Sequence, residues 1–68
     1  MFQAHLVQEY RGVHVNVFHV PGWWQTAEAA IDAARLAERE LSWTPSYIGW
    51  EEYEPSSMRT VRSGKVSP

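Results

Sequence analysis

The sequence predicts an α+β fold in which three antiparallel strands, in the order 2-1-3, carry one helix on one face. Two runs of alternating apolar residues flank the dipeptide Arg11-Gly12, which is typical of a β-hairpin. An alanine-rich segment with helical periodicity follows Pro21-Gly22, and an aromatic β-like run follows Pro45. A chain of 68 residues forms one domain and buries only about 60% of the surface that its unfolded form exposes.

The first two predicted strands, residues 2–10 and 13–19, are joined by a two-residue loop in which Gly12 adopts a positive φ. A three-residue loop, Tyr10 to Gly12, would mix apolar and polar side chains on each face of the hairpin, so we favour the two-residue loop. The face toward the helix then carries Phe2, Ala4, Leu6, Tyr10, Val13, Val15, Val17 and His19. The outer face carries Gln3, His5, Val7, Glu9, His14, Asn16 and Phe18.

The predicted helix begins after Thr26, whose hydroxyl can cap it, and Glu28 is favourably placed in its first turn. At about sixteen residues it spans roughly 24 Å, which returns the chain to the start of the second strand. Trp23 extrapolates onto the apolar stripe and Trp24 to its margin, so we expect Trp23 to fill the core and Trp24 to reach the surface. The apolar stripe consists of Ala27, Ala30, Ile31, Ala34, Ala37 and Leu41.

The third predicted strand is the run SYIGWEEYE, residues 46–54, which follows the helix-breaking Trp43-Thr44-Pro45. Alternation places Ile48 and Trp50 inward. The outward residues are Tyr47, Glu51 and Tyr53. Pairing this strand with the first one completes the sheet. We therefore place the domain at residues 1–54 and expect residues 55–68 to form a flexible basic tail, because they contain too few apolar residues to pack.

Charge and composition restrict the classes of function. Residues 1–54 contain three arginines and eight acidic residues, whereas residues 55–68 contain three cationic residues and no acid. An acidic body disfavours nonspecific binding to nucleic acid, which depends on cations that neutralise phosphates. The chain has no cysteine, no long apolar run and no signal-peptide pattern, so we expect a soluble, cytoplasmic protein without membrane contact.

No pattern of residues predicts catalysis, a cofactor or a metal site. His5 and His14 share the outer face but are about four residues apart along the ladder, which is about 13 Å and too far for one ion. The serines lack a nearby histidine and acid in a triad spacing, and the glycines form no phosphate loop. Glu51 and Glu52 point to opposite sides of a strand, so they cannot act as a catalytic pair.

One helix covers only one face of the sheet, so the other face remains as an aromatic and partly polar surface. Exposed clusters of this kind mark interaction sites. The sequence therefore predicts a non-enzymatic protein-binding module. We expect its interface to contain Phe18, Trp24, Tyr47, Glu51, Glu52, Tyr53 and Glu54.

A hairpin, an alanine-rich helix and a last strand in an acidic, cysteine-free chain resemble the small accessory proteins of bacteriophages, including several anti-CRISPR families. The resemblance covers residues 2–54 as architecture and carries over no functional residue. It implies stoichiometric inhibition of a larger bacterial protein or nucleoprotein complex in the host cytoplasm. It also implies that the run EEYE, residues 51–54, imitates phosphates, a pattern from which the basic tail departs.

Two alternatives to this function remain. In the first, the protein associates with nucleic acid, its outer-face aromatic residues stack on bases and its basic tail contacts phosphates. In the second, the chain is a structural subunit of a homodimer, and the second copy covers the outer face.

Overall fold

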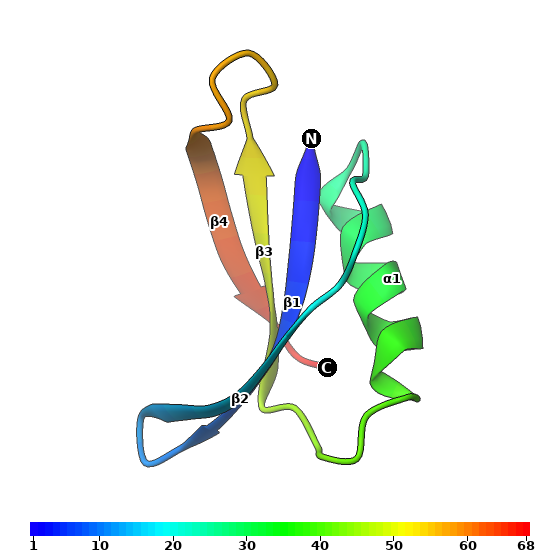
Figure 1. Ribbon diagram of the computed structural model, residues 1–68, viewed down its shortest axis with the longest axis vertical. Coiled ribbons are helices and arrows are strands. Elements are labelled where there is room, and N and C mark those ends of the chain that lie inside the picture. Colours follow the sequence, from blue (N-terminus) through cyan, green and yellow to red (C-terminus); the bar gives the residue numbers. More distant parts are fainter.

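Four strands and one helix make up the computed structural model, which describes residues 1–68 (Figure 1). The strands form one antiparallel sheet in the order β2-β1-β3-β4. The α+β class and the arrangement of the first three strands are confirmed, but the prediction of a three-stranded sheet is wrong because a fourth strand is present. The elements are β1 Phe2–Tyr10, β2 Val13–His19, α1 Ala27–Glu38, β3 Tyr47–Tyr53 and β4 Thr60–Val66.

The turn between β1 and β2 has the predicted two residues. Arg11 and Gly12 have φ values of 53° and 79°, and positive φ at both central positions is the type I′ geometry that matches the twist of a hairpin. Next to the turn the expected pairing holds, with Glu9 opposite His14. The following pair is Gln8 with Asn16, so Val15 is the extra residue of a β-bulge.

This bulge changes the face on which the second half of β2 presents its side chains. Beyond Val15 the register is one residue away from the prediction, and Phe18 lies opposite Leu6. Phe18 therefore lies on the helix side of the sheet, whereas Val17 and His19 lie on the outer side. The face predictions for these three residues are wrong, and so is the outward placement of Asn16, which lies opposite Gln8 on the helix side. The sequence gives no sign of an inserted residue within a regular alternation.

Helix α1 begins and packs as its sequence predicts, although it is shorter. The Thr26 hydroxyl accepts a hydrogen bond of 3.1 Å from the Ala29 amide, and the helix ends at Glu38 after 12 residues. Ala30 and Ala34 have no exposed surface, because their small side chains let the helix lie directly on β1 and β3. No helix in the chain has the length and apolar character needed to span a membrane.

The core lies between α1 and the sheet, on the side drawn toward the helix in Figure 1. Trp50 is half-buried at its edge, as its inward placement predicts, and its ring stands 6.0 Å from that of Phe2. Each larger buried side chain of the cluster, such as Leu6 or Ile48, contributes about 1.5–3 kcal/mol of transfer free energy. The buried cluster consists of Phe2, Ala4, Leu6, Val20, Ala30, Ala34 and Ile48.

Strand β4 occupies residues that were expected to be a flexible tail. Its backbone pairs with β3 from Tyr53↔Thr60 to Ile48↔Val66, with one extra residue, Val61. The Trp50 indole lies over Gly64, where an added Cβ would stand only 2.7 Å from the ring atoms. An edge strand of this kind gains its stability from backbone hydrogen bonds and from this cross-strand contact, and neither produces an apolar pattern in its own sequence.

We predict that Gly64→Ala destabilises the protein by about 1–3 kcal/mol, because the added methyl group must displace the Trp50 ring. The control is Ser63→Ala on the exposed side of the same strand, which should change the stability by no more than about 0.5 kcal/mol. Urea denaturation measures both values. Equal midpoints for the two variants would contradict the packing of Trp50 against β4.

Candidate functional site

The sheet face opposite α1, which we call the outer face, is a surface that the fold leaves without a covering element. Strands β1 and β3 form its centre, and β2 and β4 form its two sides. Val7 at its centre is only 1% exposed, although it lies outside the cluster beneath the helix. The expectation that Val7 would be part of an accessible surface is therefore wrong, because neighbouring outer-face side chains close over it. The residues of the outer face are Gln3, His5, Val7, Glu9, His14, Val17, His19, Tyr47, Gly49, Glu51, Tyr53, Ser63 and Lys65.

Only part of the predicted interface lies on the outer face. Tyr47, Glu51 and Tyr53 are there, as alternation along β3 predicts. The other four residues lie elsewhere. On the helix side, Phe18 stands opposite Leu6, while Trp24 and Glu52 flank Phe2. Glu54 belongs to the β3–β4 turn.

The two adjacent tryptophans point to opposite sides of the sheet, in the reverse of the predicted arrangement. The backbone of Trp24 pairs with Phe2 through hydrogen bonds of 2.8 and 3.0 Å, so this segment continues along the edge of β1. Because extended residues alternate, Trp24 packs half-buried against the core and Trp23 turns outward, 42% exposed. The prediction fails because it extends the helical periodicity to Trp23 and Trp24, which precede the helix and are extended.

Trp23 extends the outer face beyond the end of β3. Its ring meets Tyr53 edge to face at a centroid distance of 5.6 Å and an interplanar angle of 83°. An edge-to-face pair is worth about 0.5–1.5 kcal/mol beyond its buried area, so the two rings hold each other in place. The outer face therefore ends in a preorganised aromatic pair, and Trp23 is the member that the sequence analysis missed.

A histidine and a glutamate form the polar centre of the outer face. His5 Nδ1 lies 3.0 Å from Glu51 Oε2, within ion-pair distance but without hydrogen-bond alignment. The imidazole lies on Gly49, where an added Cβ would come within 2.3 Å of Nε2. Burial lowers the pKa of His5 below its ordinary 6.5, and the Glu51 carboxylate opposes this shift only in part. The ring of His19 stands 5.7 Å from that of His5, and its positive charge would lower the His5 pKa further.

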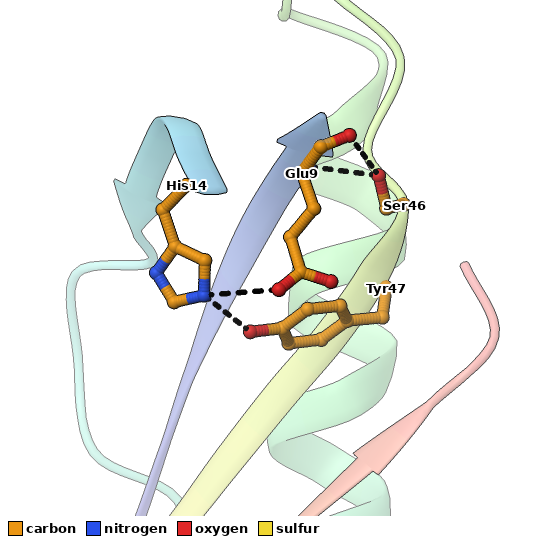
Figure 2. Close-up of polar contacts among 4 residues, drawn as sticks. All are labelled: Glu9, His14, Ser46 and Tyr47. Atoms are coloured by element: carbon orange, nitrogen blue, oxygen red, sulfur yellow. Dashed lines mark hydrogen bonds and ion pairs between the residues drawn. The ribbon is translucent and has the colours of Figure 1, made fainter. Parts of the chain in front are cut away.

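A second polar cluster joins the hairpin to β3 (Figure 2). His14 Nε2 lies 3.3 Å from both the Glu9 carboxylate and the Tyr47 hydroxyl. Ser46 faces the backbone of Glu9: its hydroxyl accepts from the Glu9 amide at 2.9 Å and donates to the Glu9 carbonyl at 3.5 Å. The serine hydroxyl is thus held by the main chain and does not contact the imidazole, so the cluster aligns strands and contains no serine–histidine pair.

Lys65 of β4 brings a positive charge to the outer face. Its ammonium nitrogen stands 4.5 Å from the centre of the Tyr47 ring, in cation–π contact. Between β1, β3 and β4 the surface is hollowed by about 220 Å³, which is smaller than the roughly 300–1,000 Å³ of small-molecule sites. This volume suits one side chain of a partner. The hollow is lined by His5, Tyr47, Gly49, Glu51, Ser63, Gly64 and Lys65.

The acidic run of β3 does not form one anionic surface. Glu51 faces His5 on the outer side, and Glu52 accepts a hydrogen bond of 2.7 Å from Arg62 on the helix side. Glu54 accepts hydrogen bonds of 2.9 Å from the hydroxyls of Ser57 and Ser56, which lower the pKa of its carboxyl group. Three carboxylates that point in different directions cannot reproduce a row of phosphates.

A second hollow, of about 410 Å³, lies on the helix side between the start of α1 and Arg62. Two of its polar side chains have partners within the chain, since Thr26 caps the helix and Glu52 accepts a hydrogen bond from Arg62. No group of three or more histidine, aspartate or glutamate side chains is arranged to hold a metal ion. The outer face is therefore the stronger candidate for a functional site.

Comparisons with known proteins identify no relative from which a function could be inferred. No protein-family model, curated protein sequence or solved structure matches the chain. The resemblance to phage accessory proteins therefore stays a prediction.

The opposite placement of the two tryptophans predicts opposite effects on stability. Trp24→Ala should destabilise the protein by about 3 kcal/mol, near the lower end of the range for buried aromatic residues, because Trp24 keeps part of its surface exposed. Trp23→Ala should cost only about 1 kcal/mol, through loss of the aromatic pair with Tyr53. Thermal melts decide the order, and a larger loss for Trp23 would show that it fills the core.

The lowered pKa of His5 predicts that acid destabilises the fold. The unfolded chain binds a proton near pH 6.5 more readily than the folded one, so stability falls as the pH drops through 6.5 toward the lower folded pKa. His5→Phe keeps a ring over Gly49 and removes this titration. Between about pH 7.5 and about pH 5.5 the wild type should therefore lose more unfolding free energy than the variant. The same loss in both proteins would rule out His5 as its source.

Proposed function

We propose that the chain is a non-enzymatic protein-binding module and that the outer face contacts its partner. One observation carries this proposal: a sheet face without a covering element presents an ordered aromatic pair, Trp23 and Tyr53, at one end and Tyr47 beneath Lys65 at its side. Tryptophan and tyrosine dominate the binding energy of protein interfaces, and rigid rings lose little entropy when a partner binds.

The polar groups of the outer face suit recognition of a protein better than catalysis. Glu9, Glu51 and Lys65 place charges of both signs around the aromatic rings of the outer face, and aromatic residues with a polar surround are the usual anatomy of a protein interface. Each of these charges has a partner on the chain: Glu9 has His14, Glu51 has His5, and Lys65 has the Tyr47 ring. Charges held in this way fix the orientation of a partner without offering an activated nucleophile.

The partner that the resemblance implies is a larger bacterial protein or nucleoprotein complex, which this small body would inhibit by occupying a site on it. Because the acidic residues of β3 face different directions, we assign the inhibition to the shape and the aromatic groups of the outer face rather than to imitation of phosphates. Binding would be stoichiometric, and the hollow beside Lys65 would receive one side chain of the partner.

Binding to nucleic acid receives less support from the same geometry. The two cations of β4 do not form a patch, because Lys65 faces the outer side while Arg62 is held by Glu52 on the helix side. The outer face also carries the carboxylates of Glu9 and Glu51, which repel phosphates. Cations that point apart cannot together track a phosphate backbone.

We predict that the double variant Trp23→Ala/Tyr53→Ala stays folded but retains less than about a tenth of the partner that the wild type captures. The measurement is affinity capture from a bacterial lysate, with the captured proteins quantified by mass spectrometry. The control variant is Leu36→Ala, which removes a 62% exposed apolar side chain from the helix, outside the outer face. It should capture as much partner as the wild type.

Two results would contradict the proposal. In the first, the double variant and Leu36→Ala retain the same amount of partner, which would mean that the outer face is not the contact. In the second, single-stranded nucleic acid binds the purified wild type with an affinity that falls steeply with salt, which is the signature of phosphate contacts. Circular dichroism of each variant establishes that it is folded before capture is compared.

A further inference from the structure

Strand β2 forms one edge of the sheet and leaves that edge unpaired. Its only strand neighbour is β1, and each of its seven residues is exposed. The strand VHVNVFH contains no aspartate, glutamate, lysine, arginine or proline. Natural proteins usually protect an edge strand with charge, proline or a covering element, because free backbone groups pair with other chains. Apart from one bulge, at Val15, β2 has none of these protections.

The other edge of the sheet is protected in the usual way. Strand β4 carries Arg62 and Lys65, and Arg59 immediately precedes it. Its bulge, at Val61, corresponds to the bulge at Val15, so bulges do not distinguish the two edges. Charge does. Two β4 edges brought together would oppose like charges, whereas two β2 edges would not.

The shape of the molecule leaves the β2 edge open to another chain. Helix α1 packs on β1 and β3 and makes no packing contact with β2, and the hairpin tip projects away from the helix (Figure 1). The apolar residues Val13, Val15 and Val17 are 62%, 50% and 44% exposed. A strand laid along β2 would cover these side chains and satisfy the free backbone groups at the same time.

We infer that the edge of β2 binds the β2 strand of a second copy, antiparallel across a two-fold axis, to form a continuous eight-stranded sheet. The occupant is assigned from charge and symmetry: β2 has no aspartate, glutamate, lysine or arginine to oppose a second β2, and a two-fold contact closes at two copies. A β2-to-β4 contact would instead be head-to-tail, which forms a ring or an open filament and not a closed pair. Only 10 of 68 residues are buried in the single chain, so a second copy supplies burial that so small a domain lacks.

The test is the oligomeric state of the full chain, measured by sedimentation equilibrium at protein concentrations up to about 1 mM. The wild type should be a dimer in this range. Val15→Lys should raise the dimer dissociation constant at least about tenfold, because it places two like charges at the joined edges. The matched control is Val61→Lys, which makes the same change at the bulge of β4, where the side chain is 54% exposed. It should leave the dimer unchanged.

Hydrogen exchange locates the contact, and Val13→Lys is the second edge variant if Val15→Lys does not fold. Amides of β2 should exchange more slowly as the wild-type concentration rises, while amides of β4 should not change. A wild type that stays monomeric over the whole range overturns the inference. So does a dimer that Val61→Lys weakens as much as the β2 variants, or one in which exchange from β2 does not depend on concentration.

Discussion

Strand β1 must have hydrogen-bond partners along both of its edges, and the rest of the structure depends on this requirement. One edge is paired by β2 and then by Val20 and Trp24, and the other is paired by β3. The side chains of β1 toward the helix, Phe2, Ala4 and Leu6, form the middle of the core. Because a buried backbone group without a partner costs as much as a lost hydrogen bond, every other element is arranged around this strand.

The strict alternation of side chains along extended segments divides the aromatic residues between stability and recognition. The segment that runs beside the start of β1 places Trp24 in the core and Trp23 on the outer face, one residue apart. Two glycines leave space for rings that pack on the sheet: Gly49 lies beneath His5, and Gly64 lies beneath Trp50. The two surfaces without a covering element, the outer face and the β2 edge, are therefore chemically different. The first has aromatic and charged groups, whereas the second offers an uncharged strand.

Much of this fold was predictable because it rests on local signals. Gly12 marks a turn that needs positive φ, Thr26 supplies a helix cap, and the alternation of Ile48 and Trp50 orients β3. The outward placement of Tyr47, Glu51 and Tyr53 followed from the same alternation. For the candidate site, alternation therefore identified the contribution of β3 and could not identify the residues that other segments bring to it.

The sequence by itself determined the first three strands, the helix and the face that β3 turns outward, because each follows from the conformational preferences of nearby residues. Only the tertiary structure decided the bulge at Val15, the outward position of Trp23 and the existence of β4. In each case the deciding energy comes from pairing with another segment of the chain: β1 sets the register of β2, Phe2 pairs with Trp24, and β3 provides the hydrogen bonds of β4. A polar edge strand carries little apolar pattern of its own, so its neighbour determines that it forms.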